Sequence, residues 1–398
     1  MEQTLTLSTL LYSIGKLFGT IGFISLTFLI FSGDTARFWN KYIGLDKIIK
    51  FQRKFSYFVA FFVIFHPIFF ILSSGSAKKF LIPNFTYTTL AAGIMALYIF
   101  VGVLIASALY KRISYTVWQY IHILTYVLFF FALYHGYSGG TADEYNPIYT
   151  IAFLLIIIGI LYRTMYKLKA KKTSKFYIKS LTQKTHDTFT LTVKGSKDFI
   201  AGQFCFLRLN KNKLYARHPF TISSAPGEDL SFTIKLAGRF TQIAKDLKDG
   251  DEIFIDGPFG NFIPKPEKDL VFIAGGVGIT PFMSILKDHV NKNIDQNITL
   301  IYGSRTENDI IFKKEFDTIN TPWFKKLYLL SLVESDAVLS PNCEKGFINK
   351  DVLERYVKNT KGSLYYICGP EIMKDNAKKL LKANGVPSAQ VYVEDFFW

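Results

Sequence analysis

The hydrophobic residues of this chain are gathered into long runs within its first 166 residues, and short alternating patterns follow them. Five runs are long and apolar enough for membrane-spanning helices, at roughly 8–31, 54–73, 88–110, 115–137 and 147–166. A helix rises about 1.5 Å per residue, so about 20 residues cross a hydrocarbon layer about 30 Å thick. The pattern therefore predicts a helical membrane domain over residues 1–168.

The pattern changes after residue 172. Short stretches of alternating apolar and polar residues, separated by Gly, Asp, Asn and Lys turns, occur at KFYIKS, TFTLTV, QFCFLRL, SFTIKL and EIFIDG. This spacing predicts a small antiparallel β-barrel over residues 172–266. From residue 267 to residue 398, strand-like and helix-like segments alternate, which is typical of an α/β domain. The predicted fold class is a membrane α-helical bundle fused to these two domains.

The distribution of charge predicts an orientation for the spans. The chain has a formal charge of +16, and many of its basic residues flank the apolar runs, in segments 37–54, 111–112 and 163–172. Lys and Arg concentrate in cytoplasmic loops, so these segments and the C-terminal half are expected on the cytoplasmic side of the plasma membrane. Segments 74–87 and 138–147, together with the N-terminus, are then expected outside. The lipid bilayer thus explains the basic charge, and nucleic-acid binding is not expected.

Three cysteines, Cys205, Cys343 and Cys368, lack the C-x-x-C spacing of zinc sites and redox motifs. They predict neither a disulfide framework nor a zinc centre, and they fit a reducing compartment. The first 16 residues lack the basic segment and the small-residue cleavage site of a signal peptide, so none is expected.

Three histidines lie inside the predicted spans, where an ionisable side chain usually faces the bundle and has a function. His66, followed by Pro67 in the second span, and His135 in the fourth span both fall in the outer half of the membrane. Each is expected to present a ring nitrogen to the same iron. Such a bis-histidine haem b carries electrons and binds no further ligand at the metal. The alternative is that each histidine is a polar residue packed between helices.

His122 lies in the inner half of the fourth span, 13 residues before His135. This spacing puts the two about 20 Å apart along a helix, which predicts a second, inner haem, but also about 140° apart around the axis. A bulge or a strong tilt is therefore expected if both histidines serve one stack. The position expected to supply a partner for His122, 14 residues before His66, holds Gln52, a poor haem ligand.

The segment DKIIKFQRKFSYFVAFFVIFHP, with the later VWQYIHILTYVLFFFALYH, resembles the ferric-reductase-like membrane domain of NADPH oxidases and ferric reductases. The resemblance implies two stacked haems, each held by one histidine from each of two helices. His66, His122 and His135 match the expected ligand positions, and Gln52 departs from them. The resemblance therefore supports the outer haem site and leaves the inner one with a single imidazole.

A second motif, RHPFTISSAP, lies between two predicted barrel strands at residues 217–226. Its Arg217 offers a planar fork for a pyrophosphate, and the residues after it give an extended edge that suits a flat ring. The motif resembles the FAD-binding run of ferredoxin-reductase-like enzymes, and the later GRFT resembles their second phosphate contact at a helix start, where free amides attract anions. The resemblance implies FAD contacts from Arg217, His218, Pro219, Phe220, Thr221, Ser223, Gly238 and Thr241. On its own, such a run is more often a plain strand and turn than a cofactor site.

The α/β part begins with DLVFIAGGVGITPFMSIL, a buried strand followed by a glycine turn and a helix start. Such a turn lets the backbone approach a dinucleotide pyrophosphate. The candidate contacts are Gly275, Gly276, Gly278, Thr280 and Pro281. Ser304 and Arg305 end the next strand, where an adenosine 2′-phosphate would lie, so NADPH is favoured and NADH stays an alternative.

The last strand-to-helix turn, in LYYICGPEIMKDN, holds Cys368, Gly369 and Pro370, with Met373 behind them. In the enzymes that this chain resembles, such a cysteine approaches the nicotinamide; a small buried Cys is the alternative. The chain ends in VYVEDFFW, and the resemblance implies that Trp398 covers the reactive face of the flavin. A stacked indole buries a large area, so it is expected to slow the entry of nicotinamide.

These expectations combine into one predicted function. The chain is predicted to move electrons from cytosolic NADPH through FAD and haem to external O₂, producing superoxide, as NADPH oxidases do. Because the sequence shows no calcium-binding loop or proline-rich tail, activity is expected without a regulatory subunit. The alternatives are a ferric-chelate reductase, an electron relay to an extracytoplasmic methionine sulfoxide reductase, and a non-redox scaffold or channel whose histidines only pack.

Overall fold

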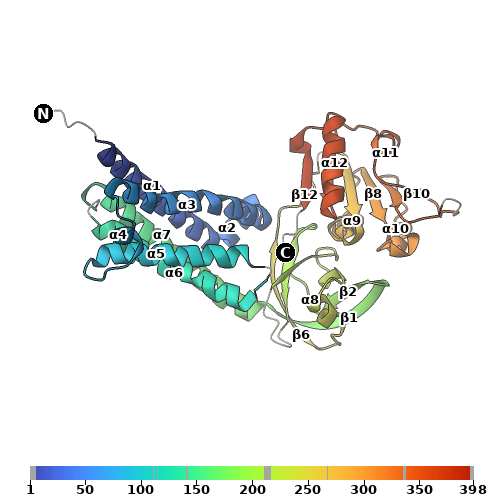
Figure 1. The fold of residues 1–398 in the computed structure, drawn as a ribbon. Coiled ribbons are helices and arrows are strands. Elements are labelled where there is room, and N and C mark those ends of the chain that lie inside the picture. Colours follow the sequence, from blue (N-terminus) through green and yellow to red (C-terminus); the bar gives the residue numbers. More distant parts are fainter. Residues whose placement is uncertain are drawn as a thin grey trace. The chain divides into compact units, whose positions relative to one another are not determined.

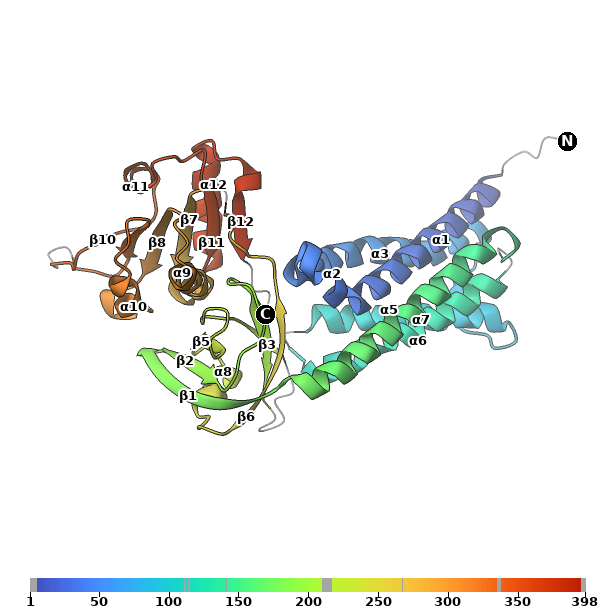
Figure 2. The same cartoon turned by 180° about the vertical axis from the view of Figure 1, so that it is seen from behind.

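The computed structural model describes most of the chain, in the ranges 6–110, 112–113, 115–139, 142–209, 217–266, 268–334 and 338–394. The chain separates into two compact units, residues 1–170 and 171–398. Figures 1 and 2 show the first unit as long helices and the second as two sheets with their covering helices. Each unit is described by itself.

The first unit is entirely helical in its described part. Its helices are α1 (Leu7–Asp34), α2 (Ala36–Ile43), α3 (Leu45–Ser74), α4 (Ala77–Leu81), α5 (Thr88–Ala108), α6 (Tyr115–Ser138) and α7 (Ala142–Thr173). Five of them, α1, α3, α5, α6 and α7, are long and apolar enough to cross a membrane, and they run side by side in Figures 1 and 2. The five predicted spans are thereby confirmed as membrane-compatible helices.

The bundle is held by apolar side chains from five of its helices. Phe23 of α1 stacks on Phe129 of α6, with ring centres 5.6 Å apart, beside Ile156 of α7. A second cluster joins Leu26 of α1 to Val59 of α3 and further residues of α5 and α6. These contacts bury the inward faces of the helices, while Phe, Leu and Ile stay exposed outside, as expected for helices that lie in lipid.

The structure differs from the predicted spans at their ends. α3 begins at Leu45 rather than near residue 54, so the basic segment between the first two spans is mostly helical. A short helix, α2, occupies the rest of that segment. Gly44, with φ of 94°, separates the two helices, and the Asn40 side chain accepts a hydrogen bond of 3.1 Å from the Leu45 amide. Charge alone made this segment resemble a loop.

The second unit begins with an antiparallel six-stranded sheet. Its strands are β1 (Lys175–Thr185), β2 (Thr188–Val193), β3 (Phe204–Arg208), β4 (His218–Thr221), β5 (Ser231–Lys235) and β6 (Glu252–Phe259), in the order β4-β3-β6-β1-β2-β5. A bridge between Ile222, directly after β4, and Phe232 of β5 joins the two ends of the order. The sheet therefore curls into a barrel around a core of Ile, Leu and Phe, capped by helix α8 (Arg239–Lys245).

A parallel sheet follows, with helices on both faces (Figure 1). Its strands are β7 (Leu270–Gly275), β8 (Ile298–Ser304), β9 (Phe324–Leu330), β10 (Cys343–Lys345), β11 (Leu364–Cys368) and β12 (Val391–Glu394), in the order β10-β9-β8-β7-β11-β12. Its α-helices are α9 (Thr280–Lys292), α10 (Lys313–Thr318), α11 (Lys350–Tyr356) and α12 (Glu371–Ala383). From β7 the order runs one way to β8 and the other way to β11, so a topological switch point lies between β7 and β11, where such sheets bind ligands. The predicted fold class is confirmed.

Candidate functional site

The membrane unit brings two of the three predicted histidines together. The rings of His66 on α3 and His135 on α6 lie with centres 6.1 Å apart and planes at 72°. The Nδ1–H of His66 donates to the Gly15 carbonyl at 2.8 Å, and that of His135 donates to the Thr89 carbonyl at 2.9 Å. A neutral imidazole that donates from Nδ1 keeps its lone pair on Nε2. Both rings are thus oriented by a backbone carbonyl, as metal-binding histidines usually are.

Two glycines make room for these rings. A Cβ at Gly19 of α1 would lie 2.5 Å from the His66 ring, and one at Gly93 of α5 would lie 2.7 Å from Nδ1 of His135. Iron bound by one nitrogen of each ring, at about 2 Å per bond, would put the ring centres roughly 6 Å apart. The residues present therefore fit a haem between His66 and His135: free Nε2 lone pairs, fixed rings and a matching separation.

The inner position is different. α6 is a regular α-helix from Tyr115 to Ser138, without the bulge expected for two ligands in one stack. His122 is exposed and stacks on Trp118 one turn earlier, with ring centres 4.8 Å apart. Gln52 turns toward α1 and donates a hydrogen bond of 3.2 Å to the Ser32 hydroxyl. Within the described residues, nothing pairs with His122 in the way that His66 pairs with His135.

The sequence analysis missed a buried polar cluster in the same bundle. Asp34 of α1 accepts hydrogen bonds through Oδ1 from the Tyr126 hydroxyl of α6 at 2.6 Å and from Arg163 of α7 at 2.9 Å. Arg163 also donates to the Tyr126 oxygen at 2.8 Å. The carboxylate is 2% exposed, and its Oδ2 has no partner in the described part of the chain. A lone Asp at the end of one apolar run and a lone Arg inside another were the available signals; Arg163 was used only to assign topology.

In the barrel, the predicted FAD-binding edge is formed by β4 and α8. The His218 and Phe220 rings both lie against Phe240 of α8, with centres 4.2 and 5.7 Å away. Arg217, directly before β4, is held by Asp256 of β6 at 2.7 Å and stays one-third exposed. Burial lowers the pKa of His218, so its ring is neutral at pH 7. Phe240 was not predicted; its position in GRFT, next to the predicted Thr241, was the available signal.

Of the other polar side chains predicted at this edge, one lacks a hydrogen-bond partner in the part of the chain that the structure describes, and two have one within the barrel domain. The Thr221 hydroxyl is buried and has no hydrogen-bond partner among the described residues. A buried orphan of this kind at the edge of β4 fits a polar contact from a bound cofactor. Ser223 instead accepts a hydrogen bond of 3.0 Å from Thr233 inside the barrel. The Thr241 oxygen accepts from the Gly238 amide at 3.1 Å, which shapes the start of α8.

The glycine turn after β7 packs tightly against the turn after β11. A Cβ at Gly278 would lie 2.4 Å from the Cys368 carbonyl oxygen, and one at Gly369 would lie 2.6 Å from Met373. A Cβ at Gly275 would lie 2.9 Å from Pro370. These glycines therefore allow two backbones to meet at the switch point between β7 and β11. Gly276, with φ of 53°, is different, because nothing lies within 4 Å of its Cβ position.

The side chain that links this turn to the next strand is Tyr302 of β8, which the sequence analysis did not select. Its hydroxyl donates to the Gly276 carbonyl at 3.0 Å and accepts from the Ile311 amide at 3.3 Å. Burial raises the pKa of Tyr302, so the phenol stays a donor. One hydroxyl thus holds both the glycine turn and the segment that follows Ser304 and Arg305.

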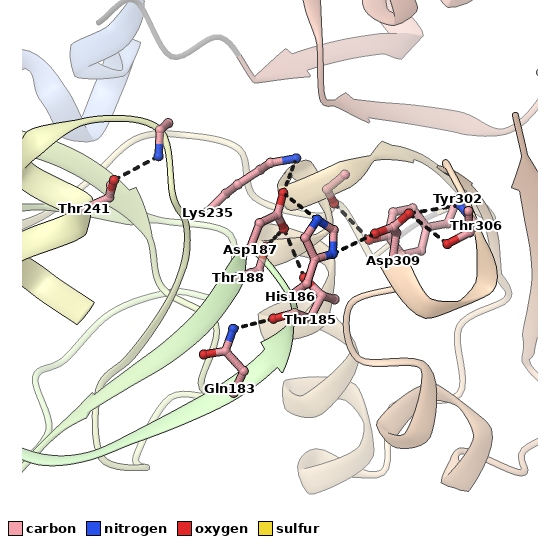
Figure 3. Close-up of polar contacts among 12 residues, drawn as sticks. Gln183, Thr185, His186, Asp187, Thr188, Lys235, Thr241, Tyr302, Thr306 and Asp309 are labelled. Atoms are coloured by element: carbon pink, nitrogen blue, oxygen red, sulfur yellow. Dashed lines mark hydrogen bonds and ion pairs between the residues drawn. The ribbon is translucent and has the colours of Figure 1, made fainter. Parts of the chain in front are cut away.

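That segment also contacts the barrel, through the tip of the β1–β2 hairpin (Figure 3). Figure 3 shows His186 directed at Asp309, and the two side chains lie 3.2 Å apart. Asp309 in turn accepts from the Thr306 hydroxyl at 2.8 Å. Burial raises the pKa of Asp187, but bonds from Lys235 and Thr188 outweigh it and hold the pKa below its usual value. Arg305 is exposed, with no carboxylate partner in the described part of the chain.

The remaining predicted residues lie at the same switch point or outside the described ranges. Cys368 ends β11 and is 2% exposed, within the core of the α/β domain. Thr280 and Pro281 begin α9, and Thr280 donates to the Val277 carbonyl at 3.0 Å. Trp398 lies outside the described residues, so its predicted cover of the flavin stays a prediction.

Comparisons with known proteins assign the three parts. Residues 17–133 match the ferric reductase like transmembrane component, residues 170–262 match an FAD-binding domain, and residues 272–379 match an oxidoreductase NAD-binding domain. The chain joins a ferric-reductase-like membrane domain to FAD-binding and NAD-binding domains. The first match includes His66, His122 and Gln52 and ends just before His135.

Individual relatives resemble part of the chain. The F component of the Na(+)-translocating NADH-quinone reductase of Idiomarina loihiensis is 32% identical over 187 residues, 44% of this chain and 43% of the relative. The corresponding component in Neisseria meningitidis is 32% identical over 166 residues, 40% of each chain. This chain thus spans less than half the length of these curated relatives. A ferredoxin NADP+ reductase from Neisseria gonorrhoeae with bound FAD and NADP shares the fold, with 20% identity, 56% of this chain and 98% of that chain covered, and a TM-score of 0.50.

Proposed function

We propose that this chain is a transmembrane NAD(P)H-dependent flavin oxidoreductase that passes electrons through haem b to O₂ on the outer side and forms superoxide. The supporting observation is the pairing of His66 and His135, each oriented by a backbone carbonyl and set 6.1 Å apart. Histidines that only pack between helices do not need Nδ1 bonds that leave both Nε2 atoms free for a metal. The pairing therefore favours a redox protein over a scaffold or channel.

The bound groups would supply the redox chemistry: nicotinamide gives a hydride, flavin divides the electron pair, and a bis-histidine haem carries one electron. The residues of this chain would hold these groups in place. Arg217, fixed by Asp256, suits the FAD pyrophosphate, and the unpartnered Thr221 hydroxyl suits a polar atom of the flavin. Gly276 leaves open space for a dinucleotide pyrophosphate at the switch point. The exposed guanidinium of Arg305 favours NADPH, because a 2′-phosphate would give it a partner.

Absorbance spectroscopy of the purified full-length protein tests the haem. His66→Ala and His135→Ala are expected to abolish the haem band while FAD content is kept. His289→Ala is the matched control, because that histidine is also buried and bonded to a carbonyl, at Ile285, but lies in α9. Wild-type protein that shows only flavin absorbance would refute the proposal. The haem-to-flavin ratio also counts sites: about one means that His122 holds no haem, and about two means that it does.

The acceptor is tested separately, because the match to a ferric reductase like component also supports a ferric chelate as second candidate. Superoxide predicts NADPH-driven reduction of cytochrome c that superoxide dismutase suppresses. Ferric-chelate reductase activity predicts anaerobic reduction of the chelate at a comparable rate, insensitive to the dismutase. The names of the relatives contain NADH rather than NADPH, so both donors are compared. Arg305→Ala is expected to raise KM for NADPH about ten-fold and to leave KM for NADH unchanged.

A further inference from the structure

A membrane crossed by α1 and α3 would place helix α2 at its surface. Helix α2 has 8 residues and connects α1 to α3, both of which are long and apolar enough to cross a bilayer. Eight residues extend only about 12 Å as a helix, so α2 is too short to cross. Because it joins the ends of two spans, it would lie where lipid headgroups begin.

The orientation of α2 is fixed by its contacts with the bundle. Ala36 and Asn40, one turn apart, are buried, and Asn40 accepts the hydrogen bond from Leu45 that starts α3. The Arg37 guanidinium lies 4.7 Å from the centre of the Tyr166 ring on α7. These contacts fix the rotation of α2 about its axis. The side of the helix away from Ala36 and Asn40 therefore faces away from the bundle, and its side chains form one surface.

That surface carries aromatic rings that are partly exposed, and of these Phe38 also packs edge-on against Tyr162 of α7, with ring centres 6.3 Å apart. Trp39 is 40% exposed and Tyr42 is 60% exposed, with Phe38 and Ile43 beside them. Trp and Tyr favour the boundary between hydrocarbon and headgroups, because their rings are apolar and their N–H or O–H groups bond to water or headgroups. The exposed rings therefore indicate contact with lipid rather than with cytosol.

The segment that holds α2 and the start of α3 has an excess of positive charge. Residues 35–54 contain six lysines and arginines and one acidic residue, Asp46. Lys41, Lys47 and Lys54 are exposed, and none of them forms an ion pair within the described residues. In the barrel, by contrast, exposed lysines such as Lys179 are paired, here with Asp229 at 2.6 Å. These cations are therefore available to a negative partner from outside the chain, although Lys41 Nζ also lies 4.6 Å from the centre of the Tyr42 ring.

We propose that α2 and the first three turns of α3 form a binding surface for the phosphate headgroups of anionic phospholipids. Lys41, Lys47 and Lys54 would contact the phosphates, and Trp39 and Tyr42 would insert among the upper parts of the acyl chains. Basic clusters next to a membrane span attract anionic lipid in this way, and the attraction is screened by salt. The surface does not depend on haem or on the electron acceptor.

Quenching of Trp39 by brominated lipid tests the proposal on the full-length protein in vesicles. One preparation contains brominated phosphatidylglycerol in phosphatidylcholine, and the other contains brominated phosphatidylcholine in phosphatidylglycerol, each at the same mole fraction of brominated lipid. The signal of Trp39 is the difference between the wild type and Trp39→Phe. Enrichment of anionic lipid predicts quenching roughly two-fold stronger by brominated phosphatidylglycerol, decreasing toward equality at high salt. The ratio cancels any quenching by bound cofactors.

Three variants assign the effect to this surface. The triple change Lys41→Gln, Lys47→Gln and Lys54→Gln is expected to bring the ratio to one, and the same three changes to Arg are expected to keep it. Lys78→Gln with Lys79→Gln, exposed on α4 at the other end of α3, is the matched control and is expected to keep it. Equal FAD content verifies folding. A ratio of one in the wild type, or an unchanged ratio in the triple Gln variant, overturns the proposal.

Discussion

The histidine pair of the membrane unit and the glycine turn of the α/β domain both depend on glycine, but for opposite reasons. In the bundle, Gly19 and Gly93 leave space for the side chains of His66 and His135, which would do the binding. In the α/β domain, Gly278 and Gly369 leave space for backbone, because two turns meet there. The first site is therefore made of side chains between helices, and the second of backbone between strands.

This difference determines what a substitution should damage. A methyl group at Gly93 meets a side chain that has other rotamers, so the bundle is expected to fold and to lose the ligand geometry. A methyl group at Gly278 meets a carbonyl group held by the parallel ladder between β7 and β11. Backbone in a sheet cannot move aside without breaking hydrogen bonds, so the folded α/β domain is expected to be destabilised.

Gly278→Ala is expected to have the largest effect. Its Cβ would lie 2.4 Å from the Cys368 oxygen and 2.7 Å from the Gly369 Cα. NADPH oxidation measured with an artificial acceptor should fall by about 100-fold or more, because overlap with fixed backbone disrupts the switch point. Gly346→Ala is the control: it follows β10 at the far edge of the same sheet, nothing lies within 4 Å of its Cβ position, and only its positive φ costs about 1 kcal/mol. Equal losses in the two variants would contradict the packing role.

Gly93→Ala should separate haem binding from flavin chemistry. Moving the His135 ring by a few tenths of an ångström or into another rotamer breaks the bond from Nδ1 to Thr89. The haem absorbance should be lost or weakened several-fold, while NADPH oxidation with an artificial acceptor is kept. Gly102→Ala, on the same helix with nothing within 4 Å, is the matched control. An unchanged haem spectrum in Gly93→Ala would speak against His135 as a ligand.

Asp34→Asn tests the polar cluster that holds three helices of the bundle together. The change leaves the Arg163 guanidinium without its buried carboxylate, which should destabilise the bundle by about 3 kcal/mol. The thermal midpoint of the detergent-solubilised protein measures it. Asp34→Asn combined with Arg163→Met removes both charges and should recover part of the loss. If the thermal midpoint of the double variant does not rise above that of Asp34→Asn, the hydrogen bonds of Arg163 stabilise the bundle beyond neutralising the Asp34 charge.

Tyr302→Phe should affect nucleotide binding with little effect on the fold. Without the hydroxyl, the Gly276 carbonyl and the Ile311 amide lose a shared partner, so the two loops of the nucleotide site are no longer coupled. A net hydrogen bond of about 1 kcal/mol corresponds to roughly a five-fold rise in KM for NADPH, with kcat unchanged. Tyr365→Phe is the control, because that buried hydroxyl bonds to Thr360 at the other end of its strand. A fall in kcat alone would refute a positioning role.

The pH dependence of stability is expected to show the smallest effect. Burial lowers the pKa of His218 in the folded chain, while the unfolded value is about 6.5. The folded state then binds fewer protons, so the stability gained from the neutral ring is complete above pH 6.5 and decreases as pH falls below it. Thermal midpoints between pH 5 and 7.5 measure the trend, and His218→Asn should reduce it. A trend that is the same in both proteins would assign it to other groups.

Most of the fold was predictable because its signals are local. Twenty apolar residues in a row, strands with a period of two and a glycine turn after a buried strand each restrict the chain within a short window. The five spans, the barrel strands and the switch-point turns followed from such windows, as did the identity of His66 and His135 as candidates. α2 was missed because basic residues made an interfacial helix resemble a loop.

The sequence by itself determined most of the elements, the motifs that they carry and the histidines that are candidates for a metal site. Tertiary structure alone decided which of those residues meet. It paired His66 with His135 and left His122 exposed, it joined Asp34 to Arg163 across 129 positions, and it placed Tyr302 beneath the glycine turn. The physical reason is that contacts between elements depend on helix rotation and strand order, which are set by packing of the whole core rather than by any single segment.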